Sequence, residues 1–168
     1  MPVALMRAGP EQEPVFQNLF QFYTHDFSEF WAGTARGDLP PHGRFAPYPM
    51  APYWTDPAWS AFLIWNDGLL AGFALTNDAP HSGRPTGRSV AEFFILRKHR
   101  RGGVGRAAAW ALFSTRPGGW EAAIVRKNVA AAAFWRTAVE GAPRASNIEV
   151  IDAETAHWNG PIVRFDWA

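Results

Sequence analysis

The sequence predicts a domain of the α+β class, because stretches typical of strands and helices follow one another in the order β-α-loop-β-β-β-α-β-α-β-β. Three observations carry this prediction. Apolar residues recur at helical spacing near the amino terminus, an Asp-Gly turn joins two apolar runs, and a glycine-rich turn follows a third apolar run. A chain of 168 residues fits one domain with one core, so we expect residues 1–168 to form a single unit.

The first half of the chain contains a short strand, a helix, a long loop and a hairpin. Residues 3–7 are a candidate first strand, and residues 13–23 place their apolar side chains on one helical face. Six prolines between positions 40 and 57 argue against a long regular element between residues 31 and 59. The runs 61–65 and 69–75 flank Asn66-Asp67-Gly68, which is typical of a hairpin turn.

The second half alternates strands and helices. Residues 76–88 form a polar loop, residues 89–96 a central strand and residues 105–114 a helix. The segment Arg116-Pro-Gly-Gly119 separates that helix from a strand at 120–125, which precedes a helix at 128–139. Gly141 and Pro143 end this helix, and the runs 147–151 and 162–167 are expected to close the sheet as an antiparallel pair.

Composition excludes several classes of function. The chain has no cysteine, hence no disulfide and no thiolate metal site, and this fits a cytoplasmic protein. A net charge of +1 argues against nucleic-acid binding, and no apolar run approaches the length of a membrane span. The first seven residues are too short and too soon polar for a signal peptide. The five histidines lack metal-ligand spacing, so we expect no metal.

The turn after the central strand has the composition of an anion-binding site. Glycines let the backbone approach an anion closely, and the free N–H groups of the following helix point toward it. The segment contains Arg100, Arg101, Gly102, Gly103, Val104, Gly105 and Arg106. A P-loop is absent, whereas a dinucleotide fingerprint remains open, with Ala108 in its third position and Glu121 as the acidic partner.

Two motifs resemble a known family. Arg100-x-x-Gly103-x-Gly105 resembles the Gln/Arg-x-x-Gly-x-Gly/Ala signature of GNAT-superfamily N-acetyltransferases, and Asn128-x-x-Ala131-x-x-Phe134-Trp135 looks like that superfamily's Asn-x-x-Ala-x-x-Phe-Tyr element. Residues 20–30 also look like a little-characterised bacterial branch of predicted acetyltransferases. The resemblance implies a mixed, mainly antiparallel central sheet flanked by helices. It also implies acetyl-coenzyme A as co-substrate.

The resemblance assigns residues to the coenzyme. The turn amides and arginines of residues 100–106 would hold the pyrophosphate, and the backbone of Phe94, Ile95 and Leu96 would bind the pantetheine amides. Asn128 has two compatible roles, because it can cap the following helix or contact the pantetheine arm. Ala131, Phe134 and Trp135 complete the set, with Phe134 expected to pack against the coenzyme.

Two groups of acidic and basic residues are candidates for the acceptor side. Glu92 is a charged residue in an otherwise apolar strand, where burial would raise its pKa, and it is the candidate general base. The alternatives are a Glu92 paired with an arginine of a neighbouring strand and one that lies in water at a strand edge. His25, Asp26 and Glu29 end the first helix, a region that borders the acceptor site in the superfamily; a charged helix end at the surface is the alternative.

Trp135 departs from the family pattern, because many relatives have a tyrosine there that protonates the coenzyme thiolate. An indole has no proton to transfer at neutral pH, so the acid is either absent or replaced by water, Tyr23, Tyr48 or Tyr53. The aromatic loop 31–60 would suit an apolar amine held against Asp38 or Asp56, and a dimer contact or a minor core explains its composition equally well.

We therefore expect direct acetyl transfer from acetyl-coenzyme A to a primary amine of a small molecule or peptide, by a monomer or homodimer. A non-catalytic acyl-coenzyme A sensor and a nucleotide-binding regulator are the alternatives.

Overall fold

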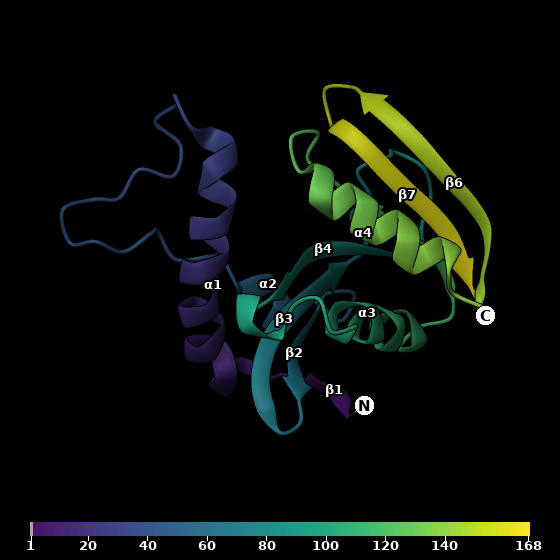
Figure 1. Ribbon diagram of the computed structural model, residues 1–168, viewed down its shortest axis with the longest axis horizontal. Coiled ribbons are helices and arrows are strands. Elements are labelled where there is room, and N and C mark those ends of the chain that lie inside the picture. Colours follow the sequence, from purple (N-terminus) through teal and green to yellow (C-terminus); the bar gives the residue numbers. More distant parts are fainter. Residues whose placement is uncertain (1) are drawn as a thin grey trace.

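The computed structural model describes residues 2–168, which form one mixed sheet with helices on both faces (Figure 1). The strands are β1 (Val3–Arg7), β2 (Ser60–Asn66), β3 (Leu69–Asn77), β4 (Arg88–Ile95), β5 (Gly118–Ala123), β6 (Ala145–Glu154) and β7 (Asn159–Trp167). The α-helices are α1 (Glu13–Ser28), α2 (Ala51–Thr55), α3 (Val104–Ser114) and α4 (Val129–Glu140). Short 3-10 turns at 10–12, 29–31 and 97–99 complete the order.

The seven strands lie in the order β1-β2-β3-β4-β5-β7-β6, and β4 with β5 is the parallel pair among otherwise antiparallel neighbours. The predicted α+β class, the mixed and mainly antiparallel sheet and the element order are therefore confirmed. The helix predicted at 13–23 continues to Ser28, and the loop expected between 31 and 59 contains the one-turn helix α2. Pro52 at the start of α2 fits the first helical turn, where no backbone N–H is needed.

The hairpin between β2 and β3 forms at the predicted turn. Asp67 and Gly68 both have positive φ, at 51° and 76°, as a two-residue turn matched to the sheet twist requires. The register continues through Phe62 opposite Ala74 and Leu63 opposite Phe73.

Alternation along the strands divides the core into two layers. Phe62 and Ile64 of β2 face α3 and α4, whereas Ala61 and Leu63 face α1 and α2. The first layer buries Trp120, Phe113 and Trp167, and the second packs Phe16 and Phe20 of α1 on Phe73. The two helical layers are thus fixed against opposite faces of the same sheet. β4 is a central strand of this sheet and lies between the two layers.

No helix within residues 2–168 is long and apolar enough to cross a membrane.

Candidate active site

The sheet opens between β4 and β5. Their parallel pairing covers only Arg88 to Val90 opposite Trp120 to Ala122, although β4 continues to Ile95. On the other edge of β4, Leu75 pairs with Glu92 and Thr76 pairs with Val90, so Ala91 is the extra residue of a β-bulge. A bulge bends its strand and increases the local twist. Beyond Val90, β4 therefore runs without β5 beside it, and two cavities occupy the space.

The first cavity, of about 750 Å³, lies at the glycine turn. Most of the residues that the resemblance assigned to the coenzyme line this cavity. They are Phe94, Ile95, Arg100, Arg101, Gly103, Gly105, Arg106, Asn128, Ala131, Phe134 and Trp135. Leu96, Gly102 and Val104 do not line it. The Leu96 N–H donates to the Ala71 carbonyl, and Val104 is buried in the core. The carbonyl of Ile95 accepts a hydrogen bond from Arg100 Nε at 2.7 Å.

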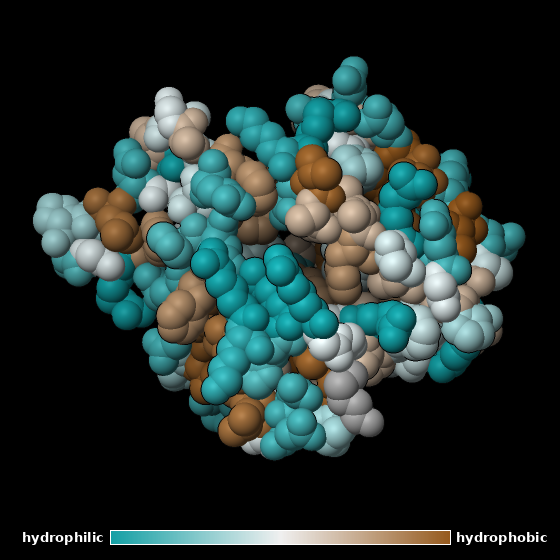
Figure 2. All heavy atoms as spheres, in the orientation of Figure 1, coloured by the Kyte–Doolittle hydropathy of each residue, from teal (hydrophilic) through white to brown (hydrophobic). Residues whose placement is uncertain are grey.

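The turn presents backbone amides at the start of α3. Gly103 caps the helix with φ of 82°, and Arg101 also has positive φ, at 67°. Within residues 2–168, no side chain caps the first turn of α3, which leaves its N–H groups for an anion. A Cβ on Gly105 would lie 3.1 Å from the Phe134 ring, so glycine allows α3 and α4 to approach closely here. Figure 2 shows a recess near the middle of the molecule, with strongly hydrophilic surface on one side and more apolar surface on the other.

The second cavity, of about 470 Å³, continues between β4 and β5 toward β6 and β7. Glu92 lines it, and burial raises the pKa of this carboxyl to about 7, while hydrogen bonding from the hydroxyls of Tyr23 and Tyr48 opposes the rise. Burial also raises the pKa of Tyr23 and of Tyr48 well above the usual value, with the charge of Glu92 adding to it. Glu92 is thus poised to exchange a proton near neutral pH while both phenols stay protonated.

The position of Tyr48 depends on two glutamines of α1. The side-chain amide of Gln17 donates to the Tyr48 carbonyl at 2.8 Å and accepts from the Tyr48 N–H at 3.0 Å. Gln21, one turn further along, makes the same pair of bonds to Phe45. Each amide thus bonds both the N–H and the carbonyl of one loop residue, as a neighbouring strand would. Tyr48 also stacks on Phe20, with ring centroids 4.0 Å apart. The aromatic loop is thereby fixed to α1.

The loop between β3 and β4 also contributes to the lining of the second cavity. His81 packs on Trp158 of the β6–β7 turn with ring centroids 4.4 Å apart, and both line the cavity. Burial lowers the pKa of His81, opposed by the charge of Glu121. Its Nδ1 is buried and has no hydrogen-bond partner within residues 2–168. His81 therefore presents a neutral ring to the cavity near neutral pH.

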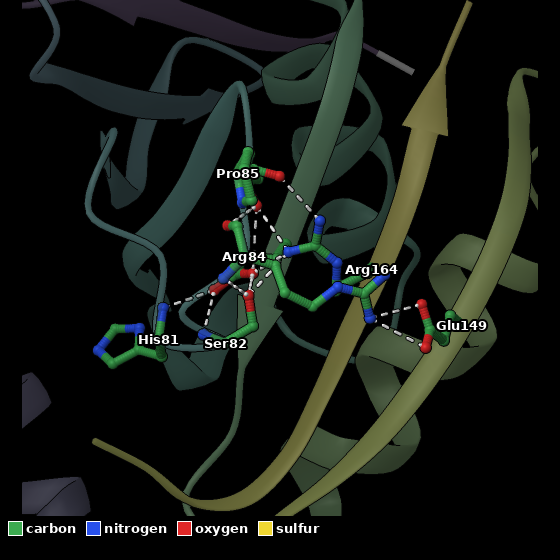
Figure 3. A network of polar contacts seen from close by, with 8 residues as sticks. His81, Ser82, Arg84, Pro85, Glu149 and Arg164 are labelled. Carbon is green, nitrogen blue, oxygen red and sulfur yellow. Dashed lines mark hydrogen bonds and ion pairs between the residues drawn. The ribbon is translucent and has the colours of Figure 1, made fainter. Parts of the chain in front are cut away.

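A buried ion pair holds this loop (Figure 3). Glu121 is 1% exposed and accepts hydrogen bonds from the backbone N–H of His81 at 2.6 Å and from the Ser82 hydroxyl at 2.6 Å. Arg164 lies 2.6 Å from the same carboxylate and also donates to Ser82 and to the Pro85 carbonyl. In Figure 3 the His81 ring points away from this network, which holds only its backbone. Glu121 is therefore engaged in holding the loop, and it does not line the cavity at the glycine turn, as the dinucleotide alternative would require.

Most of this chain matches a known protein family. The model described as "Acetyltransferase (GNAT) family" matches residues 16–139. The chain belongs to the GNAT acetyltransferase family. Membership supports acyl transfer from an acyl-coenzyme A, which agrees with a turn of free amides beside a cavity that contains a carboxylate.

Solved structures share this fold at low sequence identity. An acetyltransferase from Thermus thermophilus aligns with a TM-score of 0.65 and 14% identity over 99% of this chain and 96% of that one. The GNAT domain of S. lividans PAT aligns with a TM-score of 0.61 and 10% identity over 98% and 90%. A GNAT-family acetyltransferase from Staphylococcus aureus gives 0.59 and 7% over 98% of both chains. No curated protein matches the sequence.

The residues predicted for the acceptor occupy different places in this GNAT fold, and their role stays a prediction. Asp26 binds Arg97 and Arg100 at 2.6 and 2.7 Å, so it joins α1 to the turn after β4. Asp26 and Glu29 line the first cavity, while His25 is exposed and lines neither. Asp38 and Asp56 of the aromatic loop also line neither cavity. The carboxylate that faces the second cavity is Glu92.

Several lining residues of this GNAT domain were missed by reasoning from the sequence. The second cavity is bordered by Phe27, Trp31, Arg36, His81 and Trp158. Only the aromatic composition of residues 31–60 gave a signal, and it did not separate Trp31 from the other aromatic residues of the loop. His81 and Trp158 come from turns far apart in sequence, and no local pattern connects them.

Proposed function

We propose that this protein transfers the acetyl group of acetyl-coenzyme A to a primary amine of a small molecule or peptide, by direct attack in a ternary complex. The observation that carries the proposal is the meeting of the two cavities. Six residues line both of them: Tyr23, Phe27, Phe93, Asn128, Ala131 and Trp135. A thioester held on one side of this junction and an amine held on the other would be in contact, as direct transfer requires.

The coenzyme side supplies positive charge and backbone donors. Arg100, Arg101 and Arg106 border the first cavity beside the uncapped start of α3, which suits a pyrophosphate. Asn128 Oδ1 accepts from the Ala131 N–H at 3.1 Å and so caps α4, which leaves the side-chain NH₂ as a donor at the junction. The capping role and the coenzyme role proposed for Asn128 are therefore compatible in space.

Glu92 is the base in this proposal. An alkylamine with a pKa near 10.4 is neutral in only about one molecule in two thousand at pH 7. A carboxylate whose pKa is about 7 accepts a proton from it far more readily than an ordinary glutamate does. The arginine partner considered for Glu92 is absent within residues 2–168, where no salt bridge includes this carboxylate.

The acceptor side favours an amine with an apolar or aromatic body. Phe27, Trp31, Trp158 and the neutral His81 ring all line the second cavity. Arg36 lies over the Trp31 ring at 4.3 Å, beside the same cavity. An acceptor that carries an acidic group would therefore find a cation here.

Transfer and coenzyme binding can be tested together. Wild type is assayed with acetyl-coenzyme A and a panel of aliphatic, aromatic and amino-acid amines, next to Glu92→Gln and the exposed control Glu140→Gln. We expect Glu92→Gln to lose about 100-fold or more in turnover near neutral pH, while the control stays close to wild type. Acetyl-coenzyme A at about 100 times its Kd should raise the melting midpoint of all three by several degrees, unlike ATP or NAD.

The non-catalytic sensor is the second candidate, and Trp135 favours it. This residue is 7% exposed at the junction and offers no transferable proton where many relatives have a tyrosine. A selective thermal shift with acetyl-coenzyme A, without transfer to any amine of the panel, would support the sensor. No shift with any nucleotide would contradict both candidates.

A further inference from the structure

Tyr23 lies where the two cavities meet. It comes from α1, lines both cavities, and stacks on Phe94 of β4 with ring centroids 5.5 Å apart and planes 16° apart. Its ring is also packed against Phe20, Phe27 and Phe73, which restricts its rotation. A ring fixed by four aromatic neighbours keeps its hydroxyl in one place.

Two groups of β4 act on that hydroxyl. Burial and then the nearby Glu92 carboxylate raise the pKa of Tyr23, whereas the backbone N–H of Phe93 lowers it. Phe93 and Glu92 follow the Ala91 bulge, in the part of β4 that has no β5 partner. Phe93 lines both cavities as well. The Tyr23 hydroxyl at the junction and the Glu92 carboxylate of the second cavity are therefore close neighbours.

We propose that Tyr23 and Glu92 form a proton relay, in which Tyr23 is the catalytic acid that replaces the hydroxyl missing at Trp135. The relay rests on the proposed function. The neutral amine nitrogen forms a bond to the acetyl carbon, and its N–H proton passes to Glu92. The C–S bond breaks with its electron pair on sulfur, Tyr23 gives its proton to that sulfur, and protonated Glu92 returns a proton to Tyr23.

The net change moves one proton from nitrogen to sulfur and restores both side chains. An amine that arrives as an ammonium ion first loses its extra proton through Glu92 to water. Proton transfer from Glu92 to the thiolate is favourable. Glu92 has a pKa of about 7 and a thiol has a pKa near 8.5, so the equilibrium constant for this transfer is about 30. The raised pKa of Tyr23 keeps its proton in place until the thiolate forms.

A relay residue must line both cavities and carry a proton that it can transfer. The other groups at the site do not meet both requirements. Tyr48 interacts with Glu92 but lines only the second cavity, and Tyr53 lines neither. His81 and Arg36 line the second cavity without reaching the first. Trp135 lines both and lacks an acidic proton. Within residues 2–168, Tyr23 is thus the one ionisable hydroxyl common to the two cavities.

The test asks whether a tyrosine at position 135 restores the activity that is lost when the Tyr23 hydroxyl is removed. Tyr23→Phe keeps the ring packing and removes the hydroxyl, so we expect kcat to fall about 100-fold while acetyl-coenzyme A still raises the melting midpoint. Adding Trp135→Tyr should restore at least about tenfold of kcat, whereas Trp135→Phe, which removes similar bulk, should restore none. Retained melting midpoints verify that each variant is folded.

Tyr48→Phe is the matched comparison. It removes the other hydroxyl from Glu92, so the acidic limb of the pH profile should move to higher pH, as it should in Tyr23→Phe. Because Tyr48 does not line the first cavity, Trp135→Tyr should give Tyr48→Phe no gain.

Two results would overturn the relay alone: a Tyr23→Phe enzyme within about threefold of wild-type kcat at its own optimal pH, or equal effects of tyrosine and phenylalanine at position 135. Wild type that binds acetyl-coenzyme A and transfers to no amine would overturn the proposed function, and the relay with it.

Discussion

Glu121 and Arg164 form a buried ion pair at 2.6 Å that fixes the loop carrying His81, although neither residue touches the cavity that His81 lines. Their side chains are 1% and 15% exposed. Removing one partner of a buried pair leaves an unpaired charge, which costs about 3–5 kcal/mol. We expect Arg164→Met to lower the free energy of unfolding by that amount, measured by urea denaturation.

The exposed pair of Arg84, on the same loop, with Glu149 of β6 is the control for this prediction. Its side chains are about half exposed, so Arg84→Met should cost less than about 1 kcal/mol. Arg164→Met should also raise the KM for the amine more than that for acetyl-coenzyme A, since the loop borders only the second cavity. Equal losses in the two variants would show that burial of the ion pair contributes nothing special.

Glu92 should make stability depend on pH. Its pKa is about 7 in the folded protein and near 4.5 when unfolded, so the folded state binds more protons between these values. Stability contributed by the protonated carboxyl is therefore complete below about pH 4.5 and is lost as pH rises through about 7. The full effect is about 3 kcal/mol.

Urea unfolding of wild type and Glu92→Gln at about pH 5 and pH 8 measures this dependence. Wild type should lose stability relative to Glu92→Gln between the two values. The lowered pKa of His81 has the opposite sign, adding stability as pH rises, but it is present in both proteins and cancels in the comparison. A constant difference between the two proteins would contradict the raised pKa of Glu92.

Regular elements and the glycine turn could be predicted from the sequence because the signals are local. Asp67-Gly68 needs only its two neighbours to indicate a turn, and Glu92 stood out as a charge in an apolar strand. The position of Glu92 on a cavity is observed, and its role as base stays a prediction. The Ala91 bulge could not be foreseen, since it depends on how β4 pairs with β3.

The contacts that complete the site are not local. Gln17 and Tyr48 are separated by 31 residues, and Glu121 lies 40 residues from His81. Neither pair has a spacing that marks it in the sequence. Asp26 pairs with Arg97 and Arg100 because α1 continues past Tyr23 to the turn after β4, and no spacing in the sequence indicated these ion pairs.

Arg101 and Gly103 should respond oppositely to substitution. Arg101 has φ of 67°, which costs a non-glycine residue about 1–2 kcal/mol, whereas Gly103 at 82° avoids that cost. Arg101→Gly should keep or raise the free energy of unfolding by up to about 1 kcal/mol, since glycine also loses more entropy on folding. Gly103→Ala should lower it by about 1–2 kcal/mol.

Measuring coenzyme affinity together with stability distinguishes the backbone strain at Arg101 from the effect of its positive charge. Arg101→Gly removes a cation from the first cavity, so the Kd for acetyl-coenzyme A should rise several-fold even as the fold becomes no less stable. Calorimetric titration of both variants checks this. Parallel changes of stability and affinity in Arg101→Gly would mean that the arginine acts through the fold alone.

Gln17 should affect the second cavity, although it does not line that cavity. Its amide makes two hydrogen bonds with the backbone of Tyr48, so Gln17→Ala should cost about 1–2 kcal/mol of stability and release Tyr48 from Glu92. Losing a donor raises the pKa of Glu92, and the acidic limb of the activity profile should move to higher pH. Asn18→Ala removes an exposed amide one position along the same helix and should change neither quantity. If Gln17→Ala destabilises the protein without moving the pH profile, Tyr48 is held on Glu92 by its stacking on Phe20 instead.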